Sequence, residues 1–77
     1  MSYSVDTVEL KKAMAEKEIN NIEEFSQKSG VGRDTLSGVV KGKIRPSTAV
    51  MDKIATTLEL EPERAGRIFF VHSLRIA

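Results

Sequence analysis

The feature that most constrains this chain is the stretch of residues 21–43, where two short helical patterns meet at a turn that contains glycine. Asn21 is a good N-cap, and Glu24 three residues later completes a pattern close to a capping box. They predict a short helix with Phe25 as its buried anchor. Gly30 can adopt the left-handed conformation that ends such a helix at little cost.

A second helical pattern follows the turn and runs from about Arg33 to Val40. Leu36, Val39 and Val40 recur at spacings of three and four residues, so we expect them to share a buried face. The residues expected on the opposite face are Arg33, Asp34, Ser37, Gly38 and Lys41. Two short helices joined in this way, at about residues 21–41, are typical of a helix-turn-helix, which presents its second helix to the major groove of DNA.

Three further helices are predicted around this pair, which gives an all-α fold, a compact bundle of five helices. Asp6 or Ser4 can cap the first of them and Ser47 the second. Pro62 suits the first turn of the last. The expected bounds are about 6–17, 48–58 and 62–74, and residues 1–5 are expected to be loose. We expect one domain over residues 1–77, with a helix-turn-helix core at 6–60 and a C-terminal helix within 61–77.

A chain of 77 residues has a small core, and association with a second chain often helps such a domain. The absence of cysteine excludes disulfides, thiolate zinc sites and a cysteine nucleophile, and it fits a reducing cytoplasm. Nothing in the chain resembles a signal peptide, and no apolar run approaches the roughly 20 residues of a membrane span.

The charge is unevenly distributed, although the net charge is only +1. Residues 1–32 carry four bases and six acids, and residues 46–77 carry four of each. Residues 33–45 have a net charge of +3, from Arg33, Lys41, Lys43 and Arg45 against Asp34. Such a local basic patch is an electrostatic footprint for phosphate, although a solvated basic loop explains it about as well.

No catalytic arrangement is visible in the sequence. His72 is the only histidine and has no cysteine near it, so a packing or surface role is expected. Glu23 and Glu24 are paired carboxylates, but capping and the helix dipole explain them better than acid–base chemistry. The sequence predicts no enzyme, metal site, cofactor or small-molecule substrate.

Residues from Leu10 to about Ala65 resemble the Cro/C1-type helix-turn-helix of bacterial and phage regulators, also called the XRE or lambda-repressor-like family. The residues that carry the resemblance are Leu10, Met14 to Lys17, Glu24 to Ser26, Ser29 to Ser37, Lys41 to Lys43, Arg45 to Ser47, Ile54, Ala55 and Leu58 to Glu63. The resemblance implies that the third helix enters the major groove, with the second lying across it. It also implies two-fold dimers on operators with paired half-sites in double-stranded DNA.

Three positions depart from the family pattern. Gly32 stands where Ser or Thr commonly caps the groove helix, and a glycine cap costs a few tenths of a kcal/mol. Gly38 stands where many members carry a long polar side chain that reaches a base. Ile22 stands where a polar residue that contacts DNA is common, and an exposed isoleucine there could contact a thymine methyl group or a protein.

Four residues of the second helix are candidates for contacts with bases. Arg33 could donate two hydrogen bonds to guanine, or it could bind phosphate or pair with Asp34 or a carboxylate of the preceding helix. Thr35 and Ser37 could bond bases, waters or phosphates, or Thr35 could serve the helix terminus. Asp34 could accept from cytosine, orient Arg33 or mark a surface not devoted to DNA.

Contacts with the DNA backbone are expected on either side of that helix. Lys41, Lys43 and Arg45 would bind phosphates, which gives affinity without sequence information. Backbone N–H groups at the start of the preceding helix, near Asn21, could bind another phosphate.

The expected last helix has two apolar sides. At 100° per residue, one side carries Ala65, Ile68, Phe69, His72 and Ile76, and the other carries Phe70, Val71 and Leu74. A small bundle can bury only one side, so we expect Phe69 or Phe70, with Val71 and Leu74, to pack against another chain. The alternative is that the helix kinks and buries both sides within its own bundle.

The sequence leaves three functions open, each in a bacterial cytoplasm. The first is a phage or prophage Cro-like repressor of the lysis–lysogeny switch, acting as a homodimer. The second is an antirepressor or modulator that forms a hetero-complex with a partner repressor. The third is the antitoxin of a toxin–antitoxin pair.

Overall fold

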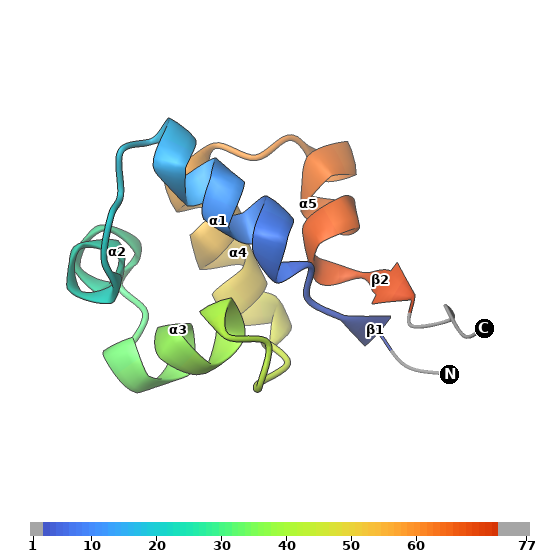
Figure 1. Ribbon diagram of the computed structural model, residues 1–77, viewed down its shortest axis with the longest axis horizontal. Helices are drawn as coiled ribbons and strands as arrows, with labels where there is room; N and C mark the ends of the chain where they lie inside the picture. Colours follow the sequence, from blue (N-terminus) through green and yellow to red (C-terminus); the bar gives the residue numbers. More distant parts are fainter. Residues whose placement is uncertain (1–2, 73–77) are drawn as a thin grey trace.

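Five helices follow one another in residues 3–72, the part of the chain that the computed structural model describes (Figure 1). For Tyr3 and His72 it describes the backbone alone. The helices are α1 (Thr7–Glu16), α2 (Ile22–Ser29), α3 (Arg33–Val40), α4 (Thr48–Leu58) and α5 (Pro62–Phe69). The prediction of an all-α fold is confirmed.

Local capping explains where the first, second and fourth helices begin. Asp6, Asn21 and Ser47 each accept a hydrogen bond from the backbone N–H three residues later, at 3.1, 2.8 and 3.3 Å. Each bond satisfies one of the donors that a helix start leaves without a partner. Asp6, rather than Ser4, is therefore the cap of α1.

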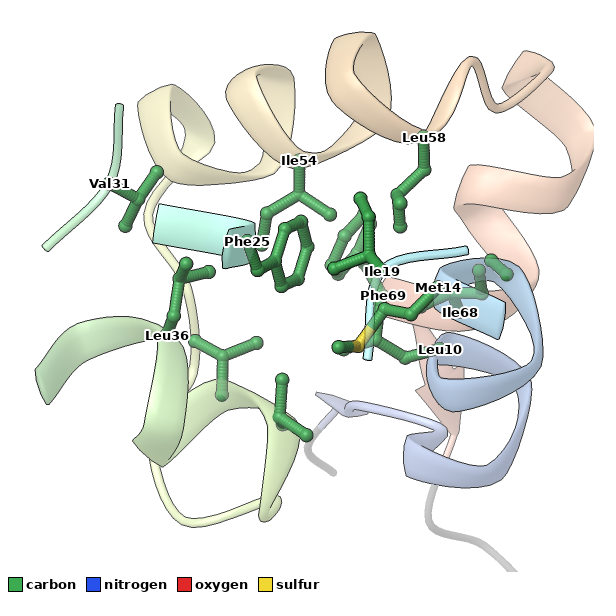
Figure 2. Packing of buried hydrophobic residues seen from close by; sticks show 13 residues of the cluster. Leu10, Met14, Ile19, Phe25, Val31, Leu36, Ile54, Leu58, Ile68 and Phe69 are labelled. Carbon is green, nitrogen blue, oxygen red and sulfur yellow. The ribbon is translucent and has the colours of Figure 1, made fainter. Parts of the chain in front are cut away.

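The core lies between the helices and draws on all five of them (Figure 2). Its fully buried side chains include Phe25 of α2, Leu36 of α3 and Ile54 of α4. The other buried members are Leu10, Ala13, Met14, Ile19, Val31, Val39, Val40, Leu58, Ile68 and Phe69. Because α3 buries one face in this core, its opposite face is fixed in an outward orientation.

The two ends of the described chain pair as a small antiparallel sheet, which the sequence did not predict. Strand β1 (Tyr3–Ser4) lies beside β2 (Val71–His72), with Tyr3 opposite His72 and Ser4 opposite Val71. The prediction of a helix reaching Leu74 is wrong, since α5 ends at Phe69. The expectation that residues 1–5 are loose is also wrong for Tyr3 and Ser4. In this pairing, backbone N–H and C=O groups of each segment find hydrogen-bond partners in the other segment.

A cluster of ion pairs between Arg64, Glu9 and Glu16 joins α1 to α5. We call it the α1–α5 seam. Arg64 donates from both terminal nitrogens to the carboxylate of Glu16, at 2.6 and 2.9 Å, and lies 4.0 Å from Glu9. The hydrogen bond from Arg64 is the main reason that the pKa of Glu16 is below its ordinary value. A parallel two-bond contact of this kind orients both side chains.

Candidate nucleic-acid interface

The turn between α2 and α3 is held by serine side chains. Gly30 has φ +79°, and it ends α2 in the left-handed conformation. The Ser26 hydroxyl donates to the carbonyl oxygen of Val31 at 2.6 Å, and the Val31 N–H donates to the Ser29 hydroxyl at 3.2 Å. Val31 itself is buried beneath the turn. The angle between α2 and α3 is therefore fixed by hydrogen bonds and by a buried side chain, and the role of the serines was missed in the sequence.

The helix α3 presents a polar outer face, as predicted. Arg33 and Asp34 are exposed, whereas Thr35, Ser37 and Gly38 are partly exposed. Gly32 is the N-cap and makes no side-chain hydrogen bond. The start of α3 therefore has no side chain of its own that caps the free backbone N–H groups.

Arg33 lies within ion-pairing distance of a carboxylate of the preceding helix. Its guanidinium lies 3.9 Å from Glu23, and both side chains are 66% exposed. Exposed pairs of this length contribute about 0–1 kcal/mol. Arg33 can therefore exchange Glu23 for a base or a phosphate at small cost. Of the partners considered for Arg33 within the chain, the carboxylate of α2 is the one observed.

Residues 41–45, which we call the basic turn, follow α3 directly. Lys41, Lys43 and Arg45 are all exposed. Within residues 3–72, Lys41 and Lys43 have no carboxylate within ion-pairing distance. Two ammonium groups are thus available to phosphate next to the outer face of α3.

Asn21 and Ile22, at the start of α2, have different surroundings. Asn21 is exposed, and its side-chain oxygen caps α2. Ile22 is half-buried, packs against the core and lines an apolar hollow of about 320 Å³ with Met14 and Val40. The expectation of an exposed Ile22 is corrected, because its side chain fills the edge of the space between α1 and α2.

The structure shows a contact on the outer face of α3 that the sequence did not reveal. Ile44, in the basic turn, lies directly over Gly38. A Cβ atom on Gly38 would lie 2.5 Å from Ile44 Cγ1 and 3.1 Å from Ile44 Cβ. Glycine at position 38 is therefore explained by close packing, and the signal in the sequence was a glycine followed six residues later by an apolar residue.

The four apolar residues proposed for an interface in the tail divide between core and surface. Phe69 is 3% exposed and belongs to the core, so its assignment to an interface with another chain is wrong (Figure 2). Phe70 is 46% exposed, and Val71 is half-buried in β2. Leu74 lies outside the described residues. Because α5 ends at Phe69 and the chain continues as β2 from Val71, Phe70 and Val71 do not follow the helical spacing that the prediction assumed.

A family model for the Cro/C1-type HTH DNA-binding domain matches residues 9–63, well over half of the chain. The chain belongs to this family. As a Cro/C1-type domain it is a DNA-binding transcription regulator, with α2 and α3 as its helix-turn-helix pair. No curated protein and no solved structure gives a match.

Residues 3–72 contain neither a membrane-spanning helix nor a cluster of metal-ligating side chains. Between residues 3 and 72, no helix has the length and apolar character that crossing a membrane requires. Within that range there is also no group of three or more histidine, cysteine, aspartate or glutamate side chains placed to hold a metal ion.

Proposed function

We propose that this Cro/C1-type protein is a small sequence-specific repressor of the phage Cro-like kind, which binds its operator as a homodimer. The observation that carries the proposal is the adjacency of two surfaces. The outer face of α3 presents Arg33, and the basic turn beside it presents Lys41 and Lys43 without carboxylate partners. One surface can read bases while the other holds the phosphates.

In this proposal α3 lies in the major groove with its first turn toward the bases. Arg33 leaves Glu23 and donates two hydrogen bonds to guanine, the commonest specific contact of this side chain. Thr35 and Ser37 bond bases or bridging waters. Asp34 accepts from a cytosine amino group or holds Arg33 in place.

Phosphate contacts set the position of the domain on the duplex. Lys41, Lys43 and Arg45 bind the backbone on one side of α3. On the other side, the backbone N–H groups at the start of α2, beside Asn21, face a phosphate. Because these contacts are few for each chain, a single copy binds weakly, and two linked half-sites raise the affinity through effective concentration.

The surface proposed for dimerisation is the end of the chain after α5. Phe70 is exposed and Val71 is half-buried, next to the small sheet that joins the two chain ends. A second copy that covered this patch would bury apolar surface that a monomer leaves in water. Ile22, at the edge of the hollow between α1 and α2, is a further candidate for a protein contact.

A selection experiment tests the proposal. Duplexes enriched from a random library by the purified protein should share a sequence with two related half-sites. Binding to the enriched duplex should weaken steeply as salt concentration rises, because each neutralised phosphate releases counterions. If no sequence is enriched at micromolar protein and binding is equal for all duplexes, the proposal of a sequence-specific repressor is wrong.

A second candidate is a modulator that binds a partner repressor through the same face. It is favoured by the two exposed carboxylates, Glu23 and Asp34, that flank Arg33. Carboxylates repel phosphate and suit a protein surface with basic groups. Co-purification with a repressor encoded next to it, together with failure to enrich any duplex, would favour this candidate over the first.

A further inference from the structure

Gly38 has no side chain, and the side chain of Ile44 occupies the space that a side chain at position 38 would fill. Gly38 lies on the outer side of α3, away from the buried Leu36 and Val39. A side chain built there would overlap Ile44 from its first atom. The apolar side chain that faces outward at this level of α3 is therefore supplied by the turn that follows the helix.

This placement is held by the backbone. The N–H groups of Lys43 and Ile44 both donate to the carbonyl oxygen of Gly38, at 2.8 and 3.1 Å. These two hydrogen bonds tie the basic turn to the last part of α3. Ile44 is thus held in position before any ligand arrives, which lowers the entropy lost when a contact forms.

Ile44 is also exposed, and basic residues lie near it in the sequence. Its exposure is 43%, and it is the only large apolar side chain that residues 33–45 leave exposed. Lys41, Lys43 and Arg45 surround it in sequence. In the major groove, thymine is the base that offers an apolar group, its 5-methyl, whereas the other base edges offer polar atoms that lose hydration against an isoleucine.

We infer that Ile44 is a specificity residue that reads the methyl group of a thymine in each half-site. The inference rests on the proposed function, in which α3 enters the major groove. It assigns readout to a residue outside the helix pair. Ile44 contacts a base pair at the level of Gly38, while Lys43 and Arg45, its neighbours in sequence, hold phosphates.

Replacing thymine by deoxyuridine tests this inference, since the exchange removes the methyl group and keeps base pairing. The probe is the best duplex enriched from the random library, with each thymine replaced in turn. For the wild-type protein, one replacement in each half-site should weaken binding about fourfold, the value expected for one buried methyl group. For Ile44→Ala, the same replacement should leave the affinity unchanged.

The matched control is Val8→Ala, which shortens another exposed aliphatic side chain, on α1. This variant should keep the wild-type preference for thymine over deoxyuridine. If Ile44→Ala does not fold, as judged by circular dichroism, Ile44→Val removes only the terminal carbon and should reduce the preference in part.

The outcomes separate the two levels of the proposal. An enriched duplex in which deoxyuridine has no effect, or the same effect in wild type and in Ile44→Ala, overturns the role of Ile44 and leaves the repressor proposal standing. Failure to enrich any duplex overturns the repressor proposal and this inference together.

Discussion

The α1–α5 seam and the basic turn use cations in opposite ways. In the seam, Arg64 is 28% exposed and is bound by Glu16 through two short hydrogen bonds. In the basic turn, Lys41 and Lys43 are exposed and have no carboxylate partner within residues 3–72. A cation that is already satisfied contributes to the fold, whereas one without a partner remains available to a ligand. From this difference we expect the position of the cations, rather than the total charge, to determine how this nearly neutral protein binds DNA.

The largest expected effect is on DNA affinity after the two lysines of the basic turn are replaced by neutral residues. Lys41→Gln combined with Lys43→Gln should lower the affinity roughly a hundredfold for each subunit near 0.1 M salt, about tenfold for each lost phosphate contact. The salt dependence should become shallower by about 2 for each subunit. Fluorescence anisotropy with the enriched duplex, repeated over a series of salt concentrations, measures both quantities.

The matched control removes two positive charges from α1 and its C-terminal cap instead. Lys12 is paired with Glu9, and Lys17 with Glu59. Lys12→Gln combined with Lys17→Gln should change the affinity far less, because both charges are already paired with carboxylates. Equal losses in the two double variants would show that net charge alone governs binding, and the distinction between the regions would fail.

A smaller effect is expected for Arg33→Ala. The loss of two hydrogen bonds to guanine should cost about 2 kcal/mol in each half-site, roughly thirtyfold in affinity for each half-site of the enriched duplex. Affinity for an unrelated duplex should change much less. Competition binding with the two duplexes measures the ratio.

Arg67 offers a matched control for Arg33. It lies 3.8 Å from Glu63 and is 68% exposed, so its surroundings are like those of Arg33, but it lies on α5. Arg67→Ala should leave the preference for the enriched duplex intact. If Arg33→Ala also left it intact, Arg33 would be a phosphate or surface residue, and the assignment of base contact would be lost.

In the seam, the expected effect is on stability. Arg64→Ala should lower the Tm by a few degrees, because it removes a paired but solvent-accessible contact between α1 and α5. Affinity for DNA at a temperature where the domain is folded should stay as in wild type. Thermal unfolding followed by circular dichroism, with Arg64→Lys as a variant that keeps the charge and loses the two-bond geometry, measures the contribution. A loss of DNA affinity without loss of Tm would place Arg64 in the binding surface.

The smallest expected effect is the pH dependence of that contact. Arg64 holds the pKa of Glu16 below its ordinary value in the folded protein. The stabilisation is therefore complete above the pH at which glutamate titrates in the unfolded chain, and it is lost as the pH falls through the folded pKa. The difference in Tm between wild type and Glu16→Gln should shrink as the pH is lowered. A difference that stayed constant would mean that the charge of Glu16 is not what Arg64 recognises.

Much of the fold could be predicted because its signals are local. The caps at Asp6, Asn21 and Ser47 bond to groups three residues away, so sequence spacing alone identifies them. The apolar spacing of α3 likewise fixed which face is buried, and hence which side carries Arg33. The match of residues 9–63 to the family confirms what the same residues indicated.

The predictions that were wrong concern segments that are distant in the sequence but adjacent in the structure. The apolar pattern after Pro62 favoured a helix to Leu74, but the chain leaves α5 at Phe69 and pairs Val71 with Ser4. The sequence gives no measure of that pairing, because it depends on the ends of the chain coming together. The same change of direction buries Phe69 and leaves Phe70 exposed.

The sequence by itself determined the helix starts, the glycine turn and the outward orientation of Arg33, because hydrogen bonds and side-chain periodicity act within a few residues. Only the tertiary structure decided the end of α5, the burial of Phe69 and the pairing of Arg64 with Glu16. It also decided the placement of Ile44 over Gly38. These features depend on the path of the backbone in space, since they require side chains or strands from separate elements to occupy one position.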